Sequence, residues 1–128
     1  MLDFEDYDTY MLLVEAGQKY AVFPSASLES EDFFRNLLAH YEGSLDPTSV
    51  VSWLEQEISH SFIALGEYPR WIQNPEWPLV GGKPMIFAGQ IDLSVQAGGA
   101  TAELFHDDTS LYVFIGRKVP PVVVMQQF

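Results

Sequence analysis

A segment rich in proline and tryptophan, followed by an apolar strand, is the feature that most constrains the fold of this chain. Residues 69–93 read PRWIQNPEWPLVGGKPMIFAGQIDL and hold Trp71, Trp77, four prolines and a Gly-Gly pair. Proline fixes its own φ and restricts the residue before it, so this segment has few accessible backbone shapes. We expect residues 69–84, here called the Trp/Pro loop, to have a fixed shape and to lie against the strand that follows.

Alternating apolar positions predict that residues 85–93 form this strand. Met85, Phe87, Gly89, Ile91 and Leu93 fall on one face, and Gln90 and Asp92 fall on the other. Further β-prone runs separated by turn signals predict an antiparallel meander. Its other strands are expected at residues 101–106, 110–116 and 122–127.

The N-terminal half carries two helix patterns after a short β-prone region. Residues 10–15 and 20–24 are apolar runs around a Gly-containing turn, which predicts a hairpin. The first helix is expected to follow Ser30 as its N-cap and to end near Gly43. The second is expected to begin at Asp46 and Pro47, as cap and first residue. Its buried stripe is expected to comprise Val50, Val51, Leu54 and Ile58. Residues 61–65 fit either the end of this helix or a short strand.

These elements predict an α+β fold, with a mainly antiparallel sheet and two helices packed on one face. The 128 residues are the size of one domain. Residues 1–67 would form an acidic hairpin plus two helices, and residues 68–128 the Trp/Pro loop and the antiparallel meander.

Charge is distributed unevenly along the chain. The net charge is −12, and residues 1–67 alone hold 13 acidic residues against Lys19 and Arg35. A negative field repels nucleic-acid phosphates and anionic lipid but attracts basic proteins. We therefore expect no nucleic-acid or membrane partner. We also expect a cytoplasmic location, because the sequence shows no signal-peptide pattern and no apolar run of the roughly 20 residues needed to span a bilayer. Either the acids favour a basic protein partner or they serve solubility alone. The candidate partner-binding residues are Glu29, Glu31, Asp32, Glu42, Asp46, Glu55 and Glu57.

Part of the chain resembles a known bacterial family. Trp77-Pro78, the turn 82–84 (GKP), the strand 87–93 (FAGQIDL) and the apolar run 111–114 (LYVF) resemble the signature of the YwqG-like family, whose function is unassigned. The resemblance covers about residues 68–116 and includes one copy of a signature that is typically duplicated. It implies membership of a group often found among bacterial immunity proteins, in which an acidic cytoplasmic protein blocks a toxin.

Three residues are candidates for a small-ligand site at the Trp/Pro loop. Trp71 and Trp77 offer flat apolar rings on which a sugar or base could stack, or else they fill the core beneath the loop. Gln90 is a polar residue in an apolar strand, and a buried amide needs hydrogen-bond partners. It either recognises a ligand at the loop or bonds the loop backbone and holds it against the sheet.

The chain shows no catalytic constellation, so we expect no enzyme activity and no cofactor. His106, Asp107 and Asp108 carry metal-binding groups, but neighbouring strand residues point to opposite faces, so a solvated turn is the preferred interpretation. The C-terminal strand Val122–Gln127 would pair two copies as a homodimer if it lies at a sheet edge, and would not if it is covered.

The first functional hypothesis is a non-enzymatic protein-binding domain. In its specific form it is a cytoplasmic immunity protein that neutralises a basic bacterial toxin. The alternatives are a ligand-binding domain or enzyme with a pocket under the Trp/Pro loop, and a homodimeric structural domain.

Overall fold

The computed structural model describes residues 1–93 and 108–128, which form three helices, a two-stranded sheet and a three-stranded sheet. Both sheets are antiparallel, so the predicted α+β class is confirmed. The predicted helix count was too low, because the expected N-terminal hairpin is a helix. No helix within these residues is long and apolar enough to cross a membrane.

Helix α1 (Tyr7–Gln18) replaces the hairpin expected at residues 10–15 and 20–24. The carboxylate of Asp6 caps the helix by accepting a hydrogen bond from the Thr9 N–H at 3.0 Å. Thr9, Leu13 and Ala16 are buried, which is a helical spacing that the β-prone composition of this run concealed. Gly17, expected in the turn, instead lies within the helix.

Helices α2 (Leu28–Ala39) and α3 (Pro47–Ser61) are the two predicted helices. Asp46 caps α3 as predicted, and Val50, Leu54 and Ile58 are buried. The cap of α2 is Ser27 rather than Ser30, and the helix ends before Gly43. Ser30 is buried in the first turn, where its hydroxyl donates to the Phe23 carbonyl at 3.2 Å. Residue 61 ends α3, and Ala64 then forms an isolated parallel bridge with Phe87.

The C-terminal half contains both sheets. Strands β1 (Leu79–Val80) and β2 (Lys83–Pro84) form a hairpin whose turn, Gly81-Gly82, has φ values of 61° and 77°. A glycine pair suits this turn because both positions have positive φ. Strands β3 (Ile86–Leu93), β4 (Thr109–Gly116) and β5 (Val119–Gln127) form the larger sheet in the order β3-β4-β5. The strand expected at 101–106 lies outside the described residues.

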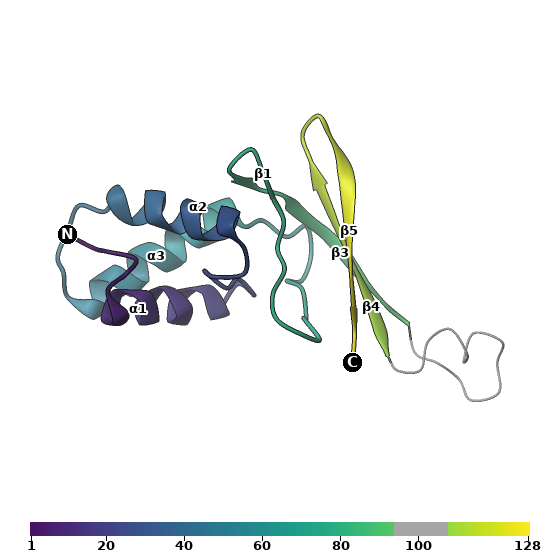
Figure 1. Cartoon of the computed structure of the whole chain (residues 1–128), viewed down its shortest axis with the longest axis horizontal. Coiled ribbons are helices and arrows are strands. Elements are labelled where there is room, and N and C mark those ends of the chain that lie inside the picture. Colours follow the sequence, from purple (N-terminus) through teal and green to yellow (C-terminus); the bar gives the residue numbers. More distant parts are fainter. Residues whose placement is uncertain (94–107) are drawn as a thin grey trace.

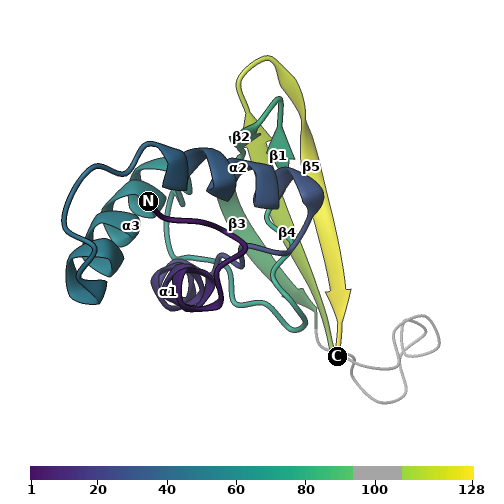
Figure 2. The same cartoon turned by 60° about the vertical axis from the view of Figure 1, so that its left-hand side comes forward.

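The molecule is layered, with the Trp/Pro loop in the middle. All three helices lie on one side of the larger sheet, and the chain between α3 and β3 runs between them and the sheet (Figure 1). The view turned by 60° shows the β4–β5 hairpin reaching past β3 toward the β1–β2 turn (Figure 2). One continuous core spans these layers and includes Phe34, Phe62, Trp77 and Phe114. Aromatic contacts link the layers, because Trp77 lies 5.3 Å from Phe62 and 5.4 Å from Phe114 between ring centroids.

A β-bulge in β3 changes which side chains face the loop. Phe87 pairs with Phe114, but Gly89 rather than Ala88 pairs with Val113, so one residue is inserted. Because side chains alternate along a strand, an inserted residue reverses the faces of every residue beyond it. The predicted alternation is therefore wrong after Phe87. Ile91 and Leu93 are exposed, and Gln90 and Asp92 share the inner face with Phe87.

Candidate functional site

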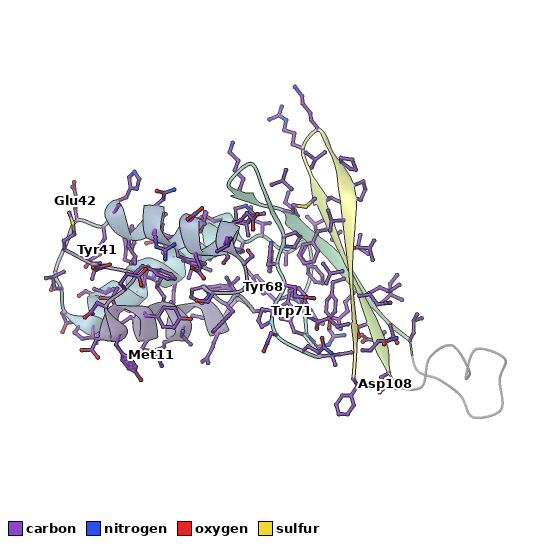
Figure 3. The ribbon with its side chains drawn as sticks, viewed as in Figure 1. Met11, Tyr41, Glu42, Tyr68, Trp71 and Asp108 are labelled. Atoms are coloured by element: carbon purple, nitrogen blue, oxygen red, sulfur yellow. The ribbon has the colours of Figure 1, made fainter. Side chains whose placement is uncertain are left out.

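The two loop tryptophans lie inside the protein. Trp77 is buried, and its Nε1–H donates to the Met85 carbonyl at 2.7 Å. Trp71 is half-buried between the helices and the sheet (Figure 3). Its Nε1–H donates to the Ala21 carbonyl at 2.8 Å, and its ring lies 4.5 Å from that of Tyr112. Both rings therefore fill the core beneath the loop, and their N–H groups are used within the protein.

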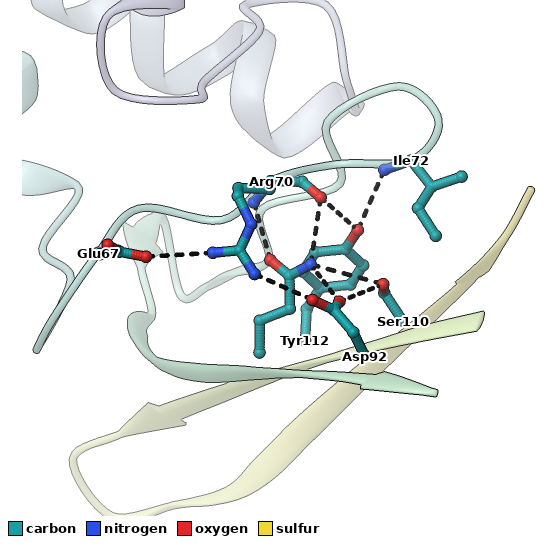
Figure 4. A network of polar contacts seen from close by, with 7 residues as sticks. Glu67, Arg70, Ile72, Asp92, Ser110 and Tyr112 are labelled. Atoms are coloured by element: carbon teal, nitrogen blue, oxygen red, sulfur yellow. Dashed lines mark hydrogen bonds and ion pairs between the residues drawn. The ribbon is translucent and has the colours of Figure 1, made fainter. Parts of the chain in front are cut away.

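Gln90 bonds the loop backbone, as one of the two interpretations of the sequence predicted. Its Oε1 accepts from the Arg70 N–H at 2.8 Å, and its Nε2 donates to the Arg70 carbonyl at 3.3 Å (Figure 4). The same Nε2 donates to Asp92 Oδ1 at 2.7 Å. Tyr112 strengthens this attachment, because its hydroxyl donates to the Arg70 carbonyl at 2.8 Å.

Asp92 connects the loop to two strands. Its carboxylate accepts from the Ser110 hydroxyl at 2.6 Å and from Arg70 Nη2 at 3.0 Å (Figure 4). The hydrogen bonds from Ser110 and then Gln90, together with Arg70, lower the pKa of Asp92 below its usual 3.8. Arg70 also contacts Glu67 at 3.2 Å, so its guanidinium lies between two carboxylates. The single positive charge of Arg70 offsets part of the negative charge of Glu67 and Asp92, and the contact with Asp92 joins the loop to β3.

Gln126 holds the same loop and was missed by the sequence reasoning. Its side chain is buried, and its Oε1 accepts from the N–H groups of Ile72 and Gln73, both at 2.9 Å. Its Nε2 donates to the Asn74 carbonyl at 2.8 Å and to Glu76 Oε2 at 3.1 Å. One signal in the sequence could have identified Gln126. It is a polar residue in an apolar strand, at a position whose side chain faces the core, and the same kind of signal identified Gln90.

A hollow of about 310 Å³ lies beside this polar cluster. Arg70, Gln90, Asp92, Ser110 and the exposed Phe128 contribute to its wall. Arg70, Gln90, Asp92 and Ser110 already bond one another, whereas the buried Thr109 hydroxyl in the same wall has no hydrogen-bond partner among the described residues. Trp71 and Trp77 do not line the hollow, so the three predicted ligand residues do not surround one pocket.

The seven predicted acidic residues do not form one cluster. Glu29 and Asp32 line a hollow of about 440 Å³ along α2, which also contains Phe33, Leu37 and Ser61. Glu42 follows α2 at the end of the helical layer far from the sheet (Figure 3). The remaining four residues have distinct neighbours. Glu31 contacts Arg35, as Asp32 also does, Asp46 caps α3, Glu55 contacts Lys19 at 3.3 Å, and Glu57 is half-buried on α3.

Charge is nevertheless separated across the fold. The helical layer carries the 12 acids between Asp3 and Glu57, whereas Lys83, Arg117 and Lys118 line one hollow of about 570 Å³ between the two hairpin turns. The negative potential therefore lies over the helices, and the sheet end beside the turns is basic.

Metal binding has no support within residues 1–93 and 108–128, which contain no group of three or more His, Asp or Glu side chains placed to hold an ion. Of the residues considered for a metal, His106 and Asp107 lie outside these ranges.

Comparisons of the chain with protein-family models, with curated proteins and with solved structures found no match. The resemblance to the YwqG-like family over residues 68–116 therefore stays a prediction.

Proposed function

We propose that this chain is a non-enzymatic protein-binding domain that recognises a basic protein through its helical layer. The observation that carries the proposal is the hollow along α2, where Glu29 and Asp32 stand beside the apolar side chains of Phe33 and Leu37. Carboxylates next to an apolar floor suit a lysine or arginine, whose aliphatic stem and charged end need different surroundings.

The rest of the helical layer supports this role at longer range. Glu42, Asp46, Glu55 and Glu57 do not line the hollow, but they belong to the same helical layer, which holds most acids of the chain. Such a field raises the rate of encounter with a basic partner more than it tightens the final complex. In its specific form, the proposal is a cytoplasmic immunity protein that blocks a basic bacterial toxin, as the family resemblance implies.

The test uses association kinetics with a panel of purified basic proteins that includes bacterial toxin domains. For any protein that binds, we expect Glu29→Gln/Asp32→Asn to slow association and flatten its salt dependence. The matched control, Asp8→Asn/Glu15→Gln, removes two exposed charges from α1 instead. It should have the smaller effect.

Two outcomes would contradict the proposal. Equal slowing by both double variants would mean that net charge alone matters and that the α2 hollow is not the binding surface. Unchanged association with both variants would remove the electrostatic role of the helical layer altogether.

A further inference from the structure

The outer face of the larger sheet is apolar around Leu111 and Val113, and no helix within residues 1–93 and 108–128 covers it. Tyr112 and Phe114 point into the core, so Leu111, Val113 and Ile115 point to the opposite face of β4. The pairing register places Ile91 and Met125 on either side of Leu111, and Gly89 and Val123 on either side of Val113. Ile91, Val123 and Met125 are 51%, 57% and 56% exposed.

The apolar composition of this outer face is unusual for a sheet whose other face is covered by the core. An antiparallel sheet with one face in water usually carries polar residues on that face. Here the two cross-strand rows named above contain no charged and no polar side chain, in a chain with 24 charged residues (18 acids and 6 bases). Contiguous apolar surface of this kind marks a contact site.

We propose that the outer sheet face binds the same face of a second copy of this chain, forming a two-fold symmetric, sheet-on-sheet dimer. Charge favours this occupant. Most of the acids lie in the helical layer on the opposite side of the sheet, so face-to-face contact puts the two negative layers at the outer ends of the dimer (Figure 1). A basic partner would instead be drawn to the helices, because these rows of the sheet offer it no carboxylate.

The size of the face sets the strength of the dimer. Three strands of about eight residues span roughly 27 Å by 14 Å, or about 400 Å² per copy. Two such faces bury about 800 Å², which is below the roughly 1,200 Å² typical of stable complexes. The dimer is therefore weak and depends on protein concentration. Each copy also carries −12, so salt should strengthen the dimer by screening the repulsion.

Sedimentation of the full chain over a range of protein and salt concentrations tests this proposal. We expect the dimer fraction to rise with both. Met125→Lys should lower the association constant at least about tenfold, because it places a charge in the contact. The matched control is Met11→Lys, which makes the same substitution at a 43% exposed methionine of α1 (Figure 3). It should leave association unchanged or slightly stronger.

Three results would overturn the proposal. A monomer at every concentration would show that the face has no second copy as its occupant. A dimer that weakens with salt would indicate contact between the acidic helices and the basic turns. A dimer that tolerates Met125→Lys would point to backbone pairing along the edge strand β5, the homodimer through Val122–Gln127 considered from the sequence. None of these measurements involves a basic partner, so they do not bear on the proposed function.

Discussion

Replacing Gln126 by leucine tests the attachment of the Trp/Pro loop. Leucine is close to glutamine in size, so the substitution removes hydrogen bonds while leaving little cavity. The N–H of Gln73 and the carbonyl of Asn74 lose the bonds that Gln126 provides. Ile72 keeps a partner, because its N–H also donates to the Tyr112 hydroxyl at 3.0 Å. Glu76 is exposed and regains water.

The magnitude follows from these losses. Two backbone groups without partners cost about 1–3 kcal/mol each, less where water reaches them, so Gln126→Leu should lower the free energy of unfolding by about 3 kcal/mol. With an m-value of about 1.5 kcal/mol/M, the urea midpoint falls by about 2 M.

Urea unfolding followed by tryptophan fluorescence and circular dichroism gives the measurement. Gln127→Leu is the control, because this neighbouring side chain is exposed and the change should cost less than about 0.5 kcal/mol. The Gln127→Leu variant is measured at low protein concentration, where the proposed dimer is dissociated, because Gln127 borders the outer sheet face. If Gln126→Leu matches this control, the four hydrogen bonds do not stabilise the fold and the reasoning fails.

A double-mutant cycle sharpens the test. Gln126 and Tyr112 both accept from the Ile72 N–H, so either single variant leaves this group one partner. Tyr112→Phe combined with Gln126→Leu leaves it none. The double variant should therefore lose about 1 kcal/mol more than the sum of the single variants. Simple additivity would show that the two side chains do not share the Ile72 N–H.

Two further predictions concern a glycine and a carboxylate. A Cβ at Gly17 would lie 2.5 Å from the backbone oxygen of Val22, so Gly17→Ala should cost about 1–3 kcal/mol. Gly66→Ala meets nothing within 4 Å and should leave the melting temperature nearly unchanged. The pKa of Asp92 is lower in the folded than in the unfolded chain, so its contribution is complete above pH about 4 and is lost as pH falls further. Asp92→Asn should reduce the loss of stability between about pH 5 and 2, and an acid profile identical to that of the unmodified chain would contradict this.

The sequence predicted elements well where one local signal determines them. Asp46-Pro47 marks the start of α3, and the apolar run expected as a strand at residues 110–116 forms β4. It failed at residues 10–15, where β-prone side chains occupy a helix capped by Asp6. Packing decides such runs, because intrinsic propensity is weak beside tertiary contacts.

The site was predictable only in part for the same reason. Gln90 stood out as an amide in an apolar strand, and its bond to the loop followed from the need to satisfy that amide. The bulge that turns it inward was missed, although a glycine inside a strand, here Gly89, often marks such an irregularity. Gln126 lies 50 to 54 residues from its partners, so no local pattern identified them.

The way in which the loop is anchored affects how its sequence can diverge. Gln90, Tyr112 and the Oε1 of Gln126 bind main-chain atoms of residues 70–73, which every amino acid other than proline supplies. Exchanging the exposed side chains of Gln73 and Asn74 therefore removes only one bond to the sheet, from Gln73 Nε2 to the Gln127 carbonyl at 2.9 Å, and leaves the main-chain anchors in place. In such a scaffold the backbone shape of the loop does not depend on its exposed side chains. Related proteins could therefore acquire new contact specificities at these positions while the core beneath stays the same.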